Sequence, residues 1–188
     1  TGYGEGENRV TTAINEAQHS PLLNNNDIFQ SQKVLLNITY SEEHELMMCI
    51  SPEHKTTENI LARGAYTVSM ATADFVDACD YVGIVSGNKV PDKFEKAGFT
   101  AEKSEFVDAP VIRELPMAVE CKLLKFNEDG ICIGEIVNIS ADESVLDEKS
   151  RVDAKKLDPI IYDSCSHAYW SFGEKVGQAF SDGKKMIK

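Results

Sequence analysis

The strongest constraint on the fold is a pair of long apolar segments joined by a short polar turn. Residues 115–126 read LPMAVECKLLKF, residues 127–130 read NEDG, and residues 131–144 read ICIGEIVNISADES. Apolar and β-branched residues on both sides of a short turn that ends in Asp-Gly are typical of an antiparallel hairpin. The fold must therefore contain an antiparallel sheet in which these two strands pair.

A second hairpin is predicted earlier in the chain. The segments KVLLNITY (33–40) and ELMMCIS (45–51) are apolar enough for strands, and SEEH (41–44) between them is a plausible turn. Because side chains alternate across a strand, we expect one set to face the barrel interior and the other set to face away. The expected interior set is Val34, Leu36 and Ile38, and the other set is Leu35 and Asn37.

The remaining elements are short. Val10, Ala13, Ile14 and Ala17 fall at helical spacing, and a second helix is expected to run to Ala62, with Gly64 as a left-handed C-cap. Further patterns predict a strand (AYTVSMATA, 65–73), two helices (DFVDACDYVGIVSG, 74–87, and PDKFEKAG, 91–98, with Pro91 in the first turn) and an irregular tail beyond residue 153. Strands interspersed with short helices, without regular alternation, predict a mainly β (α+β) fold: a small antiparallel barrel or sheet with helices on its rim.

Charge and composition exclude several classes of function. The 188 residues include 31 acidic and 19 basic side chains, and the formal net charge is −12. This charge repels a nucleic-acid backbone, and no apolar run approaches the roughly 20 residues of a membrane helix, so we expect neither partner. The five cysteines and four histidines show no metal-ligand spacing, which predicts no metal site and free thiols in a reducing compartment, the cytoplasm.

The segment SPEHKTTENI (51–60) stands out in such an acidic chain because it gathers hydroxyl, amide and basic side chains ahead of a predicted helix. Two interpretations are open. Thr56 or Thr57 can simply cap the helix, which is the commoner use of threonine at a helix start. Alternatively, free backbone N–H groups, threonine hydroxyls and the Lys55 ammonium can bind a phosphate.

From about residue 49 to residue 188 the chain resembles the flavin reductase-like family, the FMN-binding split β-barrels related to flavoredoxin. The blocks that carry this resemblance, in the family's order, are ISPEHKTTENILARGAYTVSMA, YVGIVSGNKVPDKFEKAGFT, DAPVIRELPMAVECKL, GEIVNISADESVLDE and GEKVGQAFSDGKK. The resemblance implies a split barrel with short flanking helices, FMN as cofactor and a homodimer. It also implies reduction by a nicotinamide or a small electron-carrier protein, with the flavin carrying the reaction and no side chain assigned as catalytic.

The resemblance also assigns the binding residues. The FMN phosphate and ribityl region would be held by Ser51, His54, Lys55, Thr56, Thr57 and Asn59, with Ser86 and Lys93 as further contributors. From the residues alone, Ser86 is more often a turn residue and Lys93 a solvated surface lysine. For this pair, therefore, only the resemblance indicates a binding role.

Residues 1 to about 48 resemble a different family, the bacterial tubulin-like cell-division GTPases, through GYGEGENRV, SPLLNNNDIF and KVLLNITYSEEHELMM. The chain therefore reads as a chimera of a fragment (1–46), which possibly completes the barrel, and a flavin reductase-like domain (47–188). The single tryptophan is Trp170, so the Trp-bearing early segment of the flavin reductases is absent. Two alternatives to an oxidoreductase stay open: a non-catalytic flavin-binding module, and an inactive fusion whose first segment is a structural or interaction element.

Overall fold

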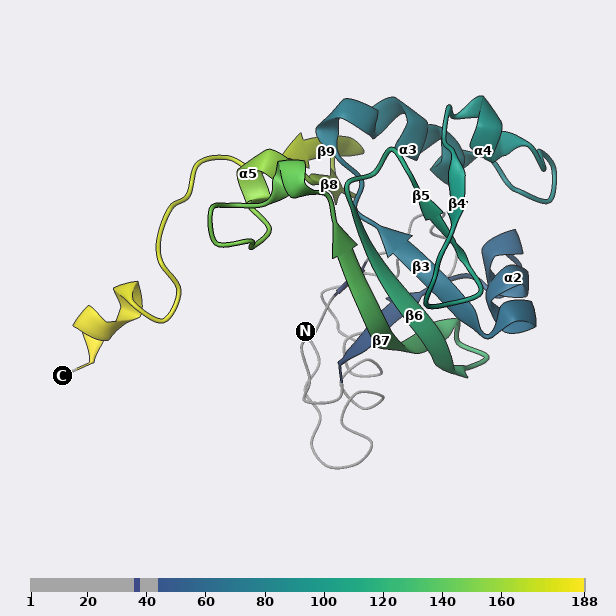
Figure 1. The fold of residues 1–188 in the computed structure, drawn as a ribbon, viewed down its shortest axis with the longest axis horizontal. Helices are drawn as coiled ribbons and strands as arrows, with labels where there is room; N and C mark the ends of the chain where they lie inside the picture. The colour runs from purple at the N-terminus through teal and green to yellow at the C-terminus, as the bar shows by residue number, and fades with distance from the viewer. Residues whose placement is uncertain (1–35, 38–43, 188) are drawn as a thin grey trace.

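The computed structural model describes residues 36–37 and 44–187, most of which lie in antiparallel strands flanked by short helices (Figure 1). The strands are β1 (Leu36–Asn37), β2 (Glu45–Cys49), β3 (Ala65–Ser69), β4 (Ala101–Lys103), β5 (Pro110–Ile112), β6 (Met117–Phe126), β7 (Ile131–Ala141), β8 (Ile160–Asp163) and β9 (Ala168–Ser171). The helices are α2 (Lys55–Arg63), α3 (Val76–Ile84), α4 (Lys93–Lys96) and α5 (Ala154–Leu157), with short 3-10 turns η3 (Ala73–Phe75), η4 (Glu143–Val145) and η5 (Asp182–Met186).

The central sheet has five strands in the order β1-β2-β7-β6-β3, and every neighbouring pair is antiparallel. The prediction of a mainly β fold organised around one long hairpin is confirmed, because β6 and β7 are the two longest strands and pair along almost their whole length. The earlier hairpin is also confirmed where it is described, since Leu36 lies opposite Met48 and Asn37 lies opposite Met47. Two smaller two-stranded sheets, β4-β5 and β8-β9, lie outside the central one.

The turn between β6 and β7 depends on one glycine. Gly130 has φ 77°, and a Cβ built there would lie 2.4 Å from the carbonyl oxygen of Ile50. The Asn127 side chain closes the turn by accepting a hydrogen bond from the backbone N–H of Ile131 at 2.8 Å. The left-handed backbone of residue 130 and its close approach to the Ile50 carbonyl both require a residue without a side chain.

The main core lies between the central sheet and α2. It contains the buried side chains Leu46, Met48, Ile50, Ile60, Tyr66, Val119, Cys121 and Cys132. Burial raises the pKa of both thiols, Cys121 and Cys132, to about 11, so they stay protonated and behave as small apolar groups.

Tyr66 of β3 crosses this core and reaches β2. Its hydroxyl donates a hydrogen bond to the carbonyl oxygen of Leu46 at 3.2 Å, and its ring occupies the space beside Gly134 of β7. A Cβ on Gly134 would lie 2.4 Å from the Tyr66 hydroxyl oxygen and 2.8 Å from two ring carbons. The absence of a side chain at Gly134 therefore lets Tyr66 link β3 at one edge of the sheet to β2, which lies beyond β6 and β7.

Two local predictions are wrong. No threonine caps α2: the N-cap is His54, whose side chain makes no capping hydrogen bond. The tail beyond residue 153 is not wholly irregular, because α5 and the β8-β9 hairpin form within it. By contrast, Gly64 does end α2 with left-handed backbone, φ 63° and ψ 22°, as predicted.

Several predictions fall on residues outside the described ranges. The helix over residues 10–17 lies there, as do Val34, Leu35 and Ile38, so the predicted alternation along that strand remains a prediction.

We expect Gly134→Ala to lower the free energy of unfolding by about 1–3 kcal/mol, the usual cost of overpacking a core, because the new methyl group would overlap Tyr66. A matched control is Gly83→Ala in α3, where a Cβ would meet no atom within 4 Å. Since alanine is a better helix former than glycine, the control should be neutral or stabilising by up to about 1 kcal/mol. Urea unfolding followed by circular dichroism measures both, and equal effects would contradict this description of the core.

Candidate functional site

The start of α2 presents unpaired backbone donors. The helix begins at Lys55, directly after His54, whose backbone is extended with φ −75° and ψ 144°. The first helical bond of this turn runs from the N–H of Glu58 to the carbonyl of His54 at 3.3 Å. The N–H groups of the three preceding residues therefore have no carbonyl partner within the helix, which is the usual arrangement at a helix start.

Thr57 is turned away from this end of the helix and stabilises the loop before it. Its side chain is 1% exposed, and its hydroxyl donates a hydrogen bond to the carbonyl oxygen of Ser51 at 2.7 Å. It lies on the face of α2 that also buries Ile60, three residues later. Thr56, next to it, is exposed.

The loop between α3 and α4 forms the other side of the site. Residues 86–90 make a turn in which the N–H groups of Lys89 and Val90 both donate to the carbonyl of Ser86, at 3.0 and 2.9 Å. The Lys93 ammonium folds back and donates to the carbonyl oxygens of Val82 at 2.7 Å and Val85 at 2.9 Å. Partial burial lowers the pKa of Lys93, yet these carbonyls at the end of α3 hold its charge in place.

Gly87 brings the two sides together. A Cβ built on Gly87 would lie 3.3 Å from Cβ of Lys55 and 3.8 Å from Cε of Lys93. The Asn88 side chain also reaches across to the carbonyl of Glu53 at 3.5 Å. We call the group formed by Lys55, Gly87, Lys93 and the first turn of α2 the α2 seat.

The α2 seat is a local concentration of positive charge and N–H donors in an acidic chain. Lys55 is half-exposed and pairs with Glu58 of the same helix at 2.5 Å, which leaves its ammonium two further donor positions. A lysine pair beside free helical N–H groups is the arrangement that binds a phosphate or carboxylate.

The structure brings together only part of the predicted set. Lys55 and Lys93 flank Gly87, while Ser86 and His54 lie at the ends of the two loops that meet there. Asn59 is exposed one helical turn after Lys55, on the same side of α2. Ser51 accepts the Thr57 hydrogen bond through its carbonyl, and the Thr57 hydroxyl is already used in that bond. The assignment of these residues to a ligand remains a prediction.

Two residues that bring the two sides of the seat together were not among the predicted ones. Gly87 permits the close approach of Lys55, and Asn88 links the two loops. The Gly-Asn pair within SGNKVPD is a turn signal in the sequence, but a turn signal does not indicate which other loop will pack against it.

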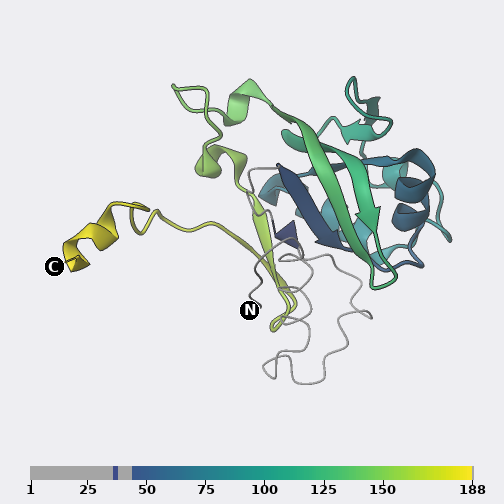
Figure 2. The same cartoon turned by 90° about the horizontal axis from the view of Figure 1, so that it is seen from below.

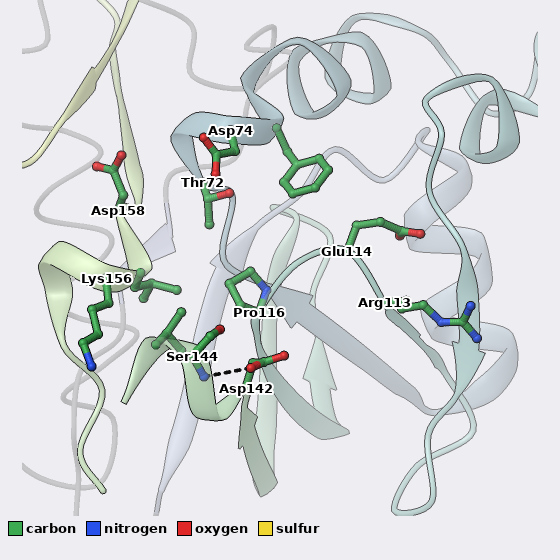
Figure 3. Close-up of a pocket in the computed structure, with 12 residues that line it drawn as sticks. Thr72, Asp74, Arg113, Glu114, Pro116, Asp142, Ser144, Lys156 and Asp158 are labelled. Atoms are coloured by element: carbon green, nitrogen blue, oxygen red, sulfur yellow. Dashed lines mark hydrogen bonds between the residues drawn. The ribbon is translucent and has the colours of Figure 1, made fainter. Parts of the chain in front are cut away.

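A hollow of about 270 Å³ lies elsewhere in the molecule, between η3, η4 and α5 (Figure 3). Its walls carry the carboxylates of Asp74, Glu114, Asp142 and Asp158 against only two cationic side chains. Two of these carboxylates already accept backbone hydrogen bonds, Glu114 from Thr100 and Asp142 from Ser144, each of which lowers the pKa of its carboxyl. This acidic hollow does not suit an anionic ligand, so the α2 seat is the better candidate.

Other kinds of site find no support in the part of the chain that the structure describes. No group of three or more histidine, cysteine or carboxylate side chains could hold a metal ion within residues 36–37 and 44–187. Over the same residues, no helix combines the length and apolar character needed to cross a bilayer.

The flavin reductase like domain family matches this chain over residues 41–166. An uncharacterized protein of Aquifex aeolicus (strain VF5) is 30% identical over 149 residues, which cover 73% of this chain and 74% of that protein. The matched residues include both sides of the α2 seat, namely the start of α2 and the loop between α3 and α4.

Solved structures agree in fold. Flavoredoxin of Desulfovibrio vulgaris (Miyazaki F) superposes with a TM-score of 0.75 at 37% identity, covering 79% of this chain and 80% of that one. A putative flavin reductase with split barrel domain from Shewanella frigidimarina NCIMB 400 gives a TM-score of 0.64 at 23% identity, covering 76% and 73%. The predicted split-barrel fold is confirmed.

The first part of the chain has a separate relative. Cell division protein FtsZ of Porphyromonas gingivalis (strain ATCC BAA-308 / W83) is 61% identical over 46 residues, which make up 24% of this chain and 10% of that protein. The predicted resemblance to the tubulin-like cell-division proteins is confirmed over this short stretch.

We expect Thr57→Val to lower the free energy of unfolding by about 1 kcal/mol, because valine keeps the shape of threonine but cannot donate to the Ser51 carbonyl. Thr56→Val is the matched control, since its side chain is exposed and should change stability by less than about 0.5 kcal/mol. Chemical denaturation of both variants tests this, and a larger loss from Thr56→Val would indicate that the exposed threonine is the structural one.

Proposed function

Because this chain belongs to the flavin reductase like domain family, we propose that it binds FMN and acts as an oxidoreductase. The observation that carries the proposal is the α2 seat, in which Lys55 and Lys93 flank Gly87 beside the free N–H groups of a helix start. An acidic chain of net charge −12 can hold a dianionic phosphate only where donors and cations are gathered locally.

The donor set fits the phosphate end of FMN. Lys55 would contribute a charge-assisted hydrogen bond, and the first-turn N–H groups would contribute neutral ones. Gly87 leaves room beside Lys55, because any larger residue there would press against the Lys55 side chain. His54, Thr56, Asn59 and Ser86 surround this position and would complete the contacts to the phosphate and ribityl chain.

The chain's own residues would bind and orient rather than react. Bound FMN would supply the two-electron chemistry that no side chain of the seat provides. Thr57 would act indirectly by fixing the Ser51 carbonyl, and the α3 carbonyls that hold Lys93 would fix its charge beside the seat. We assign no general base, and we propose a reduced nicotinamide or a small electron-carrier protein as the electron donor.

We further propose a homodimer in the cytoplasm. All five cysteines are free, and such thiols suit a reducing compartment. The dimer follows from the family resemblance, in which the flavin lies at a two-fold interface.

We propose that the chain joins a tubulin-like segment (1–46) to the flavin reductase-like domain (47–188). Strand β2 runs from Glu45 to Cys49 and crosses this boundary, with Leu46 fully buried in the core. The first segment would therefore contribute part of a central strand, which supports the idea that it completes the barrel. Intact-mass measurement together with sequencing of the encoding gene tests whether both parts belong to one natural chain.

The runner-up proposal is a flavin-binding module without turnover, or an inactive fusion. The short match to FtsZ favours it, because the family resemblance implies an early Trp-bearing segment in that part of the chain, and the single tryptophan is Trp170. A flavin absorption band in the purified protein would exclude the inert fusion. Anaerobic bleaching of that band by NADH or NADPH would exclude the non-catalytic module.

We expect Lys55→Ala to weaken FMN binding by roughly 1.5–3 kcal/mol, the range for hydrogen bonds to charged groups, or about 10- to 150-fold in Kd. The melting temperature without flavin should change little, because the Lys55 side chain is half-exposed. Flavin fluorescence quenching measures the affinity and thermal denaturation measures the stability.

The matched control is Lys125→Ala on β6, which removes the same charge from an exposed position outside the seat. Unchanged FMN affinity in Lys55→Ala, or an equal loss in both variants, would contradict the phosphate assignment.

A further inference from the structure

The acidic hollow between η3, η4 and α5 is a separate place from the α2 seat. It lies at the open end of the β6-β7 hairpin, because its walls include Pro116, just before β6, and Asp142, just after β7. The turn of the same hairpin packs through Gly130 against the carbonyl of Ile50, in the loop before α2. Both views show α5, another wall of the hollow, beyond the end of β7 (Figures 1 and 2).

Backbone contacts join two walls of the acidic hollow. The N–H of Ala73 donates to the carbonyl oxygen of Asp158 at 3.0 Å, and Thr72 forms an isolated β-bridge with Pro159. Asp158, the C-cap of α5, is thereby held beside the segment that carries Thr72 and Asp74. Two carboxylates that are far apart in the sequence therefore line one hollow.

These two carboxylates differ from the other two in the hollow. Glu114 and Asp142 each accept a backbone hydrogen bond. Within the residues that the structure describes, the carboxylates of Asp74 and Asp158 make no ion pair and accept no hydrogen bond, although both line the hollow. Their charge is therefore available to a ligand.

The cationic side chains in the walls do not neutralise Asp74 and Asp158. Arg113 forms an ion pair with Glu102 at 2.5 Å. The Lys156 ammonium donates to the carbonyl oxygen of Leu146 at 2.5 Å. Both cations thus have other partners, and the hollow keeps an excess of negative charge.

Thr72 is the observation that points to a ligand. The residue is only 6% exposed, yet its side chain lines the hollow. It is the N-cap of η3, but its hydroxyl makes no capping hydrogen bond, and Figure 3 shows none from it to another lining residue. Over residues 36–37 and 44–187 this hydroxyl has no hydrogen-bond partner. Because buried polar groups are nearly always hydrogen-bonded, a group that enters the hollow is the expected partner.

The lining favours a small aliphatic amine. A primary ammonium has three N–H donors and no acceptor, and Asp74, Asp158 and Thr72 offer three acceptor groups. The ring of Phe75, which also lines the hollow, suits the same cation. Drug-sized ligands take pockets of roughly 300–1,000 Å³, so a hollow of about 270 Å³ suits a smaller molecule. Four carboxylates against two cations favour a ligand with two positive charges.

We propose that the acidic hollow binds a small aliphatic diamine. One ammonium bonds to the carboxylates of Asp74 and Asp158 and to the hydroxyl of Thr72. The second ammonium lies toward Glu114 and Asp142. This site is separate from the α2 seat, so the inference does not rest on the binding of FMN.

The first test is calorimetric titration of the full chain with 1,4-diaminobutane, with 1,4-butanediol as an analogue of similar shape that carries no charge. The diamine should bind at one site per chain, and the diol should give no heat of binding. Absence of diamine binding at millimolar concentration, or equal binding of the diol, would overturn the proposal.

The second test places the diamine in the hollow. Asp158→Asn should weaken its binding by about tenfold or more, and Thr72→Val should weaken it by about threefold or more. Asparagine tolerates the left-handed backbone of residue 158, where φ is 44°, and valine keeps the shape of threonine. The control is Glu148→Gln, which removes the same charge from an exposed side chain outside the hollow and should leave the affinity unchanged.

An equal loss in Glu148→Gln would show that the acidic surface as a whole attracts the diamine, and it would overturn the proposal. Circular dichroism checks that each variant folds. Asp74→Asn, at an exposed position of η3, takes the place of Asp158→Asn if the latter does not fold, with the same expected loss. Unchanged affinity in both Thr72→Val and Asp74→Asn would also overturn the proposal.

Discussion

The pairing of β6 with β7 is the constraint on which the rest of the molecule depends. Strand β7 pairs with β2 on its other edge and β6 pairs with β3, so one hairpin fixes four strands of the sheet. Tyr66 then crosses from β3 to the backbone of β2 through the space that Gly134 leaves open. The backbone pairing of the strands and this side-chain hydrogen bond border the same core. A change that disrupts one of them is therefore expected to disturb the other.

The central sheet also determines where the candidate site lies. Helix α2 lies between β2 and β3 in the chain, so the sheet determines where its first turn is placed, and the loop after α3 packs against it at Gly87. The seat then depends on short-range contacts: a helix start without a side-chain cap, a lysine held by carbonyls, and a glycine between two lysines. The overall electrostatic field of an acidic protein repels an anion. Such a protein can therefore bind an anion only where donors and cations are gathered locally.

The sequence predicts the elements whose signals are local. The long hairpin, the left-handed end of α2 at Gly64 and the helix over α3 all follow from spacing and turn chemistry. The cap by Thr56 or Thr57 fails because Thr57 falls on the buried face of α2, where its hydroxyl finds the Ser51 carbonyl instead. The contact of Gly87 with Lys55 joins segments 32 positions apart, which no local pattern reveals.

Calorimetric titration of the unaltered protein with FMN and with riboflavin tests whether the α2 seat holds the phosphate of FMN. The two ligands share the ring and the ribityl chain and differ only in the phosphate. We expect FMN to bind at least tenfold more tightly than riboflavin, and we expect this advantage to shrink as the salt concentration is raised, because it comes from charged groups. Equal affinity for both ligands, or an advantage that salt does not change, would contradict this role of the seat.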